Sequence, residues 1–131
     1  MKIIIIIIIM FSMAGCSTVR TVAGIGPPES DIQAVYPEHK NKVYIVKSNL
    51  PDTVKYTVVK DLWYGSGWYG SSDRVIEELA FNARKLGADA VIDVKVWWSP
   101  RGMSFASPHA SGKAIKLTEP IDLSVYPGEW W

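Results

Sequence analysis

The residues most capable of chemistry in this sequence are one cysteine, Cys16, and two histidines, His39 and His109. A lone cysteine can be a nucleophile, a metal ligand, a buried apolar residue or an attachment point, and it cannot form a disulfide within the chain. Neither histidine has a thiol near it in the sequence, and isolated histidines are more often surface residues than metal ligands. The sequence therefore predicts no metal site and no cofactor.

No motif assembles the other polar residues into a catalytic unit. The sequence has no Ser-His-Asp pattern with supporting context, no phosphate loop and no recognisable acid pair. The formal charge of +1 gives no basic track for a nucleic acid. We therefore predict that the protein is not an enzyme and has no nucleic-acid partner.

The segment before Cys16 is typical of an exported protein. Lys2 is followed by seven isoleucines, Ile3 to Ile9, in an apolar run of roughly a dozen residues. A membrane-spanning helix needs about 20 such residues, whereas the hydrophobic region of a signal peptide is this short. The residues Met13-Ala14-Gly15-Cys16 resemble the bacterial lipobox, in which the cysteine thiol is lipidated and the signal is cut before it.

The lipobox resemblance implies that residues 1–15 are a lipoprotein signal peptide and that Cys16 is the lipidation site, carrying palmitate or similar acyl chains. Such chains anchor a domain because each buried CH₂ contributes about 0.8 kcal/mol. Ser17 favours the outer membrane, facing the periplasm, since an aspartate there would resemble an inner-membrane retention signal. The expected location is the bacterial cell envelope. The alternative is an ordinary signal peptide that leaves an incidental cysteine.

The remainder divides into a linker and a small domain. Residues 16–42 contain glycine and proline without a sustained period, which predicts a flexible linker, part of which could instead pack on the domain. Residues 43–131 carry strand and helix patterns and end in an aromatic tail, Ser124–Trp131. This tail is expected to dock on the sheet or to meet a partner.

The domain patterns predict the element order β-β-α-β-β. Short alternating runs predict four strands: Val43–Val46, Val54–Trp63, Ala90–Trp98 and Gly112–Thr118. Apolar residues at helical spacing predict one helix, which starts with a serine cap at Ser71-Ser72-Asp73 and stops at Gly87. Ser99–Ser111 is expected to be a long loop. The predicted fold is α+β, with one helix packed on a small, mostly antiparallel sheet.

Two stretches are similar to a known family. "ARKLGADAVIDVKV", Ala83–Val96, and "GKAIKL", Gly112–Leu117, resemble the small YbjQ-like domain family and the RcsF-like envelope-stress lipoproteins. The resemblance implies the α+β fold, a tendency to form homo-oligomers, and a role in envelope stress sensing or maintenance. The chain lacks the disulfides of RcsF-like domains, and no residue cluster supports the metal binding often ascribed to YbjQ-like ones. Asp89 is expected to hydrogen-bond local amides.

Aromatic residues are the best candidates for binding, and they fall in three places. These are the glycine-rich stretch Trp63–Ser71, the sheet face away from the helix, and the tail. The candidate residues are Trp63, Tyr64, Trp68, Tyr69, Trp97, Trp130 and Trp131. In the strand Ala90–Trp98, Ile92, Val94 and Val96 are expected to face the helix, and Val91 and Trp97 to point away. The aromatics of the glycine-rich stretch are expected either to be exposed or to fold back on the core.

These observations predict a membrane-anchored, non-enzymatic envelope lipoprotein. Its partners are expected to be the membrane, through the lipid anchor, and either an envelope protein or further copies of itself. The alternative is a ligand-binding module for glycan, peptidoglycan or metal that uses the aromatic glycine-rich loop or His109.

Overall fold

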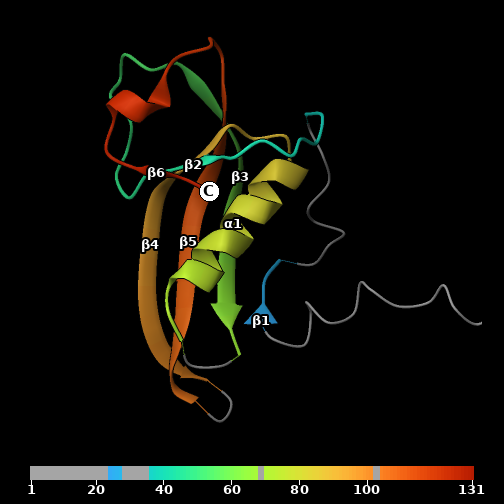
Figure 1. Ribbon diagram of the computed structural model, residues 1–131, viewed down its shortest axis with the longest axis vertical. Helices are drawn as coiled ribbons and strands as arrows, with labels where there is room; N and C mark the ends of the chain where they lie inside the picture. Colours follow the sequence, from blue (N-terminus) through green and yellow to red (C-terminus); the bar gives the residue numbers. More distant parts are fainter. Residues whose placement is uncertain (1–23, 28–35, 68–69, 102–103) are drawn as a thin grey trace, which may run out of the picture.

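A computed structural model describes residues 24–27, 36–67, 70–101 and 104–131. Within these residues one helix packs against one face of a six-stranded sheet (Figure 1). The elements are β1 Gly24–Ile25, β2 Tyr44–Ile45, β3 Tyr56–Ser66, α1 Asp73–Lys85, β4 Ala90–Arg101, β5 Ser104–Leu117, the 3-10 helix η3 Leu123–Val125 and β6 Glu129–Trp130. The predicted signal peptide, Cys16 and the pair Trp68–Tyr69 lie outside the described residues.

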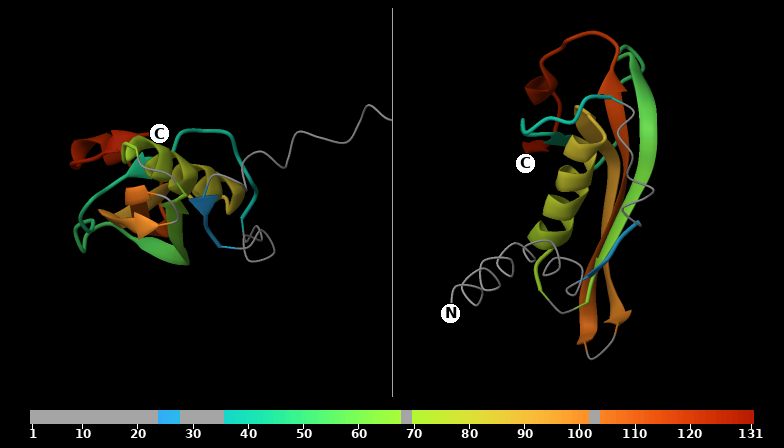
Figure 2. Two further views of the ribbon diagram at one scale, coloured as in Figure 1. Left: turned by 90° about the horizontal axis from the view of Figure 1, so that it is seen from below. Right: turned by 90° about the vertical axis from the view of Figure 1, so that its right-hand side faces the viewer.

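The sheet has the strand order β1-β3-β5-β4-β2-β6. The central strand β5 runs antiparallel to both β3 and β4, so β3 and β4 run parallel to each other on either side of it. Helix α1 connects these two strands and lies across one face of the sheet (Figure 2). β2 pairs parallel with β4, and β1 and β6 add antiparallel edges. The predicted α+β fold, with one helix on a mostly antiparallel sheet, is confirmed.

Helix α1 has the predicted apolar face and the predicted stop. Its buried side chains are Val75, Ile76, Leu79, Ala80 and Ala83. Gly87 follows with φ +75°, and its N–H donates to the Arg84 carbonyl at 3.1 Å while the Ala88 N–H donates to the Ala83 carbonyl at 2.9 Å. These two bonds form a Schellman motif. The predicted serine cap is wrong, because Ser72 has helical dihedrals and makes no side-chain cap hydrogen bond.

The loop predicted at Ser99–Ser111 is wrong. β4 continues to Arg101 and β5 begins at Ser104, so the two strands form one long hairpin. Composition rich in serine, glycine and proline favours loops, but pairing across the hairpin overrides it. Pro108 is tolerated because it lies one residue beyond the last registered pair of β3 with β5, which is Gly65 with His109.

A β-bulge in β4 changes which residues face the helix. The register with β5 shifts between Ile92 and Lys95, and Asp93 has φ +52° there. A bulge inserts one residue, so the alternation of faces reverses across it. Val91 and Val94 therefore both pack in the helix-side core, whereas Ile92 packs on the opposite side. The predictions that Ile92 faces the helix and that Val91 points away are wrong.

A second core lies on the sheet face away from α1, at the end of the sheet near β2. It combines strand residues with side chains from the segments after β2 and around η3: Tyr44, Val46, Leu50, Val54, Ala90, Ile92, Ile115 and Leu123. We call the sheet face away from α1 the outer face. Its end near β2 is covered in this way, and its other half carries two of the candidate binding residues, Trp63 and Trp97.

Two segments of the predicted linker contact the domain. Gly24–Ile25 form β1, which pairs with the end of β3. Further on, the Tyr36 and His39 amides donate to the Leu86 and Arg84 carbonyls at 3.4 and 3.3 Å. The His39 ring also bonds the Ala88 carbonyl at 2.6 Å. These residues therefore belong to the surface of the domain rather than to a free tether.

Candidate functional site

The exposed half of the outer face carries two tryptophans on strands that flank β5. In the register, Trp63 of β3 lies opposite Ser111, and Trp97 of β4 lies opposite His109. Both point away from α1, because their strand neighbours Leu62 and Val96 pack toward the helix side. Trp63 is 45% exposed and Trp97 is 44% exposed. The prediction that Trp97 points away from the helix is therefore correct.

Polar residues fill the sheet surface between and beside these rings. In register on the three long strands they are Asp61, Lys95, His109, Ser111 and Lys113. Together with Trp63 and Trp97 we call this set the aromatic face. Asp61 lies directly opposite Lys113, and Lys95 lies directly opposite Ser111. The aromatic face therefore joins flat apolar rings to hydrogen-bonding groups, with charges of both signs.

The Trp97 ring is held by its cross-strand neighbour. Its plane stacks on the His109 ring, with the centroids 5.6 Å apart and an angle of 10° between the planes. The Ser99 hydroxyl bonds His109 Nε2 at 2.7 Å. Cross-strand ring pairs of this kind stabilise a sheet surface. Ser99 and His109 thus position Trp97 and leave its other surface toward solvent.

A serine and histidine at this distance also have the spacing of a nucleophile and a base. The His109 ring in this contact also stacks on the Trp97 ring. We therefore interpret the Ser99–His109 contact as one that positions the Trp97 ring.

Tyr64 does not belong to the aromatic face. It follows Trp63 in β3, so its side chain points to the helix side, where it is 7% exposed and part of the core. Gly26 packs close to its ring, and a Cβ at Gly26 would lie 3.1 Å from the ring atom Cδ2. The two alternatives for the glycine-rich stretch both occur, since Trp63 is exposed while Tyr64 folds back on the core. Trp68 and Tyr69 lie outside the described residues.

The tail docks on the sheet. β6 pairs with β2, and the backbones of Trp131 and Val43 exchange two hydrogen bonds of 2.9 Å. The Trp131 carbonyl also accepts a hydrogen bond of 3.0 Å from Arg84 Nη1. Trp131 packs against the helix-side core, whereas Trp130 is 46% exposed and its ring lies 4.9 Å from the ring of Tyr44. Neither tryptophan is part of the aromatic face.

The residues that sequence reasoning missed are the polar ones between Trp63 and Trp97. The sequence does contain an alternating pattern that indicates their position, but the loop-favouring residues of this stretch obscure it. From Ser107 to Lys113 polar residues alternate with Pro108, Ala110 and Gly112, which is the period of a strand with one polar face. The serines, glycine and proline of this stretch favoured a loop instead. A period-two count would have placed His109 and Ser111 on one face.

The edge of β4 is the second exposed feature. β2 covers this edge only at Ala90 and Val91, and bonds to the segment after β2 continue as far as Val94. From Lys95 to Pro100 the edge has no pairing partner in the described part of the chain, and Figure 1 shows it as the free side of the sheet. Because N–H groups alternate along a strand, those of Val96 and Trp98 point to the open side.

Charged groups elsewhere make local structural contacts. Asp89 accepts the Leu117 amide at 2.8 Å and lies 3.3 Å from Lys116 Nζ. Its amide partner thus comes from β5, not from the local turn as predicted. At η3, hydrogen bonds from the side chain and the amide of Ser124 lower the pKa of Asp122. Across residues 24–27, 36–67, 70–101 and 104–131, no group of three or more His, Cys, Asp or Glu is placed to hold a metal.

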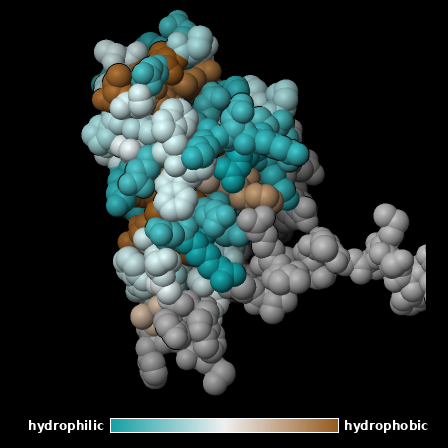
Figure 3. Space-filling model, viewed as in Figure 1, coloured by the Kyte–Doolittle hydropathy of each residue, from teal (hydrophilic) through white to brown (hydrophobic). Residues whose placement is uncertain are grey.

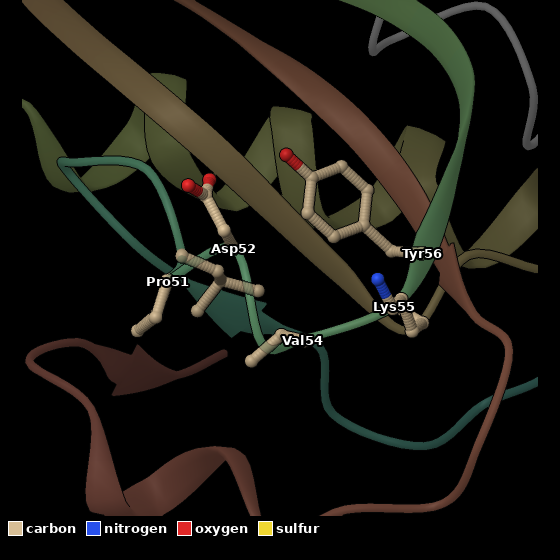
Figure 4. A pocket seen from close by; sticks show the side chains of 6 residues that line it. Pro51, Asp52, Val54, Lys55 and Tyr56 are labelled. Atoms are coloured by element: carbon tan, nitrogen blue, oxygen red, sulfur yellow. The ribbon is translucent and has the colours of Figure 1, made fainter.

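The described residues form hollows at the end of the sheet near β2. One of them, about 650 Å³, lies between the segment 37–42, the end of β5 and Trp130. Another of about 450 Å³ lies between the start of α1 and the tail. A third of about 230 Å³ is lined by residues 50–52 and 54–56, with Asp52 and Tyr56 at its sides (Figure 4). The lining residues named for these hollows do not include Trp63, Trp97 or His109.

The helix side of the molecule is largely hydrophilic. Figure 3 shows this surface, on which hydrophobic residues gather at the end that η3 occupies. Val125 of η3 is 71% exposed there. None of the helices within the described residues has the length and apolar character that crossing a membrane requires.

Comparisons with known proteins gave no match: no family model, no curated protein and no solved structure matches the chain. The class of protein that the structure defines is therefore a small α+β domain with a split β-α-β core and an exposed aromatic face. The resemblance to YbjQ-like and RcsF-like proteins stays a prediction from Ala83–Val96 and Gly112–Leu117.

Proposed function

We propose that the chain is a non-enzymatic lipoprotein of the bacterial cell envelope that is anchored through Cys16. We propose further that its domain docks onto another protein. The docked protein is an envelope partner or a second copy, and the role is in envelope stress sensing or maintenance. The lipobox-like residues Met13 to Cys16 support the anchor. The observation that carries the docking proposal is the open edge of β4.

An open strand edge supports docking because it offers unpaired backbone groups. An extended segment can add to such an edge as a further strand, with main-chain hydrogen bonds supplying affinity. The N–H groups of Val96 and Trp98 are the donors on this side of β4. Trp97 and Trp98 project from the same edge onto opposite faces, so an added strand would meet an indole on each side.

The same edge is limited in length. The bulge at Asp93 and the charge of Lys95 bound it at one end, and Pro100 bounds it at the other. Bulges, lysines and prolines are features that restrict edge pairing between strands. We therefore expect a short addition centred on residues 96–99. Open-ended stacking of sheets is not expected.

The anchor is tested by metabolic palmitate labelling of the wild type and of Cys16→Ala. Label is expected in the wild type alone, together with loss of membrane association in the variant. Equal palmitate labelling of the wild type and Cys16→Ala would contradict the lipoprotein assignment.

Docking is tested in whole cells with a photocrosslinking amino acid at position 95, beside the open edge. The control carries it at the exposed position 40, on the segment that enters the domain. We expect a discrete adduct from position 95 that is lost in Val96→Pro, which removes an outward N–H. An adduct of twice the chain mass indicates a second copy, and any other discrete mass indicates an envelope partner. Equal labelling from both positions, or no adduct, would contradict the proposal.

A further inference from the structure

The aromatic face combines two exposed indoles with the polar residues between them. The cores of protein–protein interfaces lack this arrangement. Interface cores are depleted of charged residues, and their apolar side chains are contiguous. Here Trp63 and Trp97 are separated by β5, whose outward residues His109 and Ser111 are polar. A ligand that fits must therefore present apolar surface at two separate points and hydrogen-bonding groups between them.

The register fixes how far apart the two indoles are. Trp63 and Trp97 lie two strands apart and are offset by two residues along the strands. With the usual spacings of strands and residues, their Cα atoms are about 12 Å apart. This exceeds the width of a single sugar ring and suits a short run of linked rings. The stacking of His109 fixes the plane of Trp97, so little side-chain entropy remains to be lost there on binding.

We propose that the aromatic face is a binding site for a glycan, a chain of linked pyranose rings that lies across β5 from Trp63 to Trp97. The C–H face of a pyranose packs on an indole, and its hydroxyl groups meet hydrogen-bonding side chains. Between the two indoles the surface supplies the outward hydroxyl of Ser111 on β5. Ser99 and His109 are positioning residues that act through the Trp97 ring.

The charge of the surface favours a glycan over a single-stranded nucleic acid, the other ligand that stacks on aromatic side chains. Nucleic-acid sites combine stacking with a positively charged groove that follows the phosphates. Here Asp61 lies opposite Lys113, and the whole chain has a formal charge of only +1. The glycan site goes beyond the proposed function and does not depend on the lipid anchor or on the edge of β4.

The test is a titration of the domain, residues 16–131, with N-acetylglucosamine, its linear tetramer and a thymidine oligonucleotide, followed by NMR shifts of the indole N–H groups. The tetramer is expected to bind at least tenfold more tightly than the monomer, since only the tetramer reaches both indoles. Trp63→Ala and Trp97→Ala should each reduce tetramer affinity about tenfold and abolish its advantage over the monomer.

Two control variants remove exposed indoles that lie outside the aromatic face. Trp98→Ala removes an indole that is 52% exposed but lies on the opposite face, and Trp130→Ala removes one beside Tyr44. Both controls should bind the tetramer as the wild type does. If Trp97→Ala fails to fold, Trp97→Leu keeps the packing while losing the flat ring. Ser99→Ala should weaken tetramer binding several-fold and leave monomer binding at Trp63 unchanged.

Three outcomes would overturn the proposal. One is the absence of tetramer binding at millimolar concentration, and another is an equal loss of affinity in the control variants. The third is binding of the oligonucleotide without binding of the sugar, which would assign the face to a nucleic acid. None of these bears on the crosslinking result at position 95, so the glycan site and the docking edge fail or survive separately.

Discussion

The Asp89 carboxylate accepts a hydrogen bond of 2.8 Å from the Leu117 amide, and this bond joins the turn after α1 to the end of β5. The same carboxylate lies 3.3 Å from Lys116 Nζ. Asp89 is the acidic residue of the Leu-Gly-Ala-Asp-Ala stretch, and this contact gives it a structural role. It ties the turn after α1 to the last residues of β5.

Replacement of Asp89 by alanine is expected to destabilise the domain by about 1–2 kcal/mol, because the Leu117 amide loses a charged acceptor. Asp89→Asn keeps an acceptor oxygen and should cost less. Urea unfolding measures both changes. The control is Asp52→Ala, an exposed acid before β3, which is expected to change stability by less than about 0.5 kcal/mol. Similar losses at both positions would contradict this role.

Gly87 is expected to be intolerant of any side chain. Its φ of +75° is unfavourable for other residues, and a Cβ would lie 2.6 Å from the Tyr36 carbonyl oxygen. Gly87→Ala should therefore cost about 2–4 kcal/mol, measured by thermal and urea unfolding. Gly70→Ala is the matched control, since a Cβ at Gly70 meets no atom within 4 Å. If the two variants unfold alike, the left-handed turn does not matter to stability.

Gly112 lies opposite the bulge in β4, where the neighbouring strand crowds it. A Cβ there would lie 2.6 Å from Val91 Cγ1 and 3.0 Å from Val94 Cγ2. Overpacking of this kind costs about 1–3 kcal/mol, which is the loss expected for Gly112→Ala. A double-mutant cycle with Val91→Ala is the check, because removing Val91 Cγ1 should recover part of the loss. Strict additivity of the two changes would argue against crowding as the cause.

Much of the fold was predictable because its signals are local. The helix is marked by spacing from Val75 to Ala83, and its end by Gly87, since only glycine suits that turn. The strands within Ser99–Ser111 were not predictable from composition. Their residues favour loops on their own, and the pairing of β4 with β5 stabilises them as strands. The face of Ile92 depended on the bulge at Asp93, which alternation along one strand cannot reveal.

The candidate site was predictable only in its tryptophans. Exposure of Trp63 beside a buried Tyr64 follows once the stretch is known to be strand rather than loop. The link from Ser99 through His109 to Trp97 depends on cross-strand register, which brings together residues that are separate in the sequence. Cys16 and the pair Trp68–Tyr69 remain predictions from the sequence.

The acid of η3 gives a prediction about pH. Hydrogen bonds from Ser124 to Asp122, 2.5 Å from the hydroxyl and 3.0 Å from the amide, lower the pKa of this carboxyl from its ordinary value of 3.8. A lowered folded-state pKa contributes stability above the unfolded value, and that contribution is lost as the pH falls through the folded one. In Ser124→Ala the pKa of Asp122 should rise toward 3.8, as followed by carbon NMR of the carboxyl. No rise would contradict the assignment of the cause.

Strand β2 lies between β4 and β6, so Tyr44 adjoins both Ala90 and Trp130, which are far away along the chain. β3, α1, β4 and β5 instead follow one another, and closing their loops costs less entropy. The central unit is therefore expected to assemble in the folding transition state, with β2 and β6 joining afterwards. Ile45→Val should then mainly accelerate unfolding, while Leu79→Ala should slow folding, in stopped-flow measurements. The tail is thus expected to add to a sheet that is already formed and to slow its unfolding.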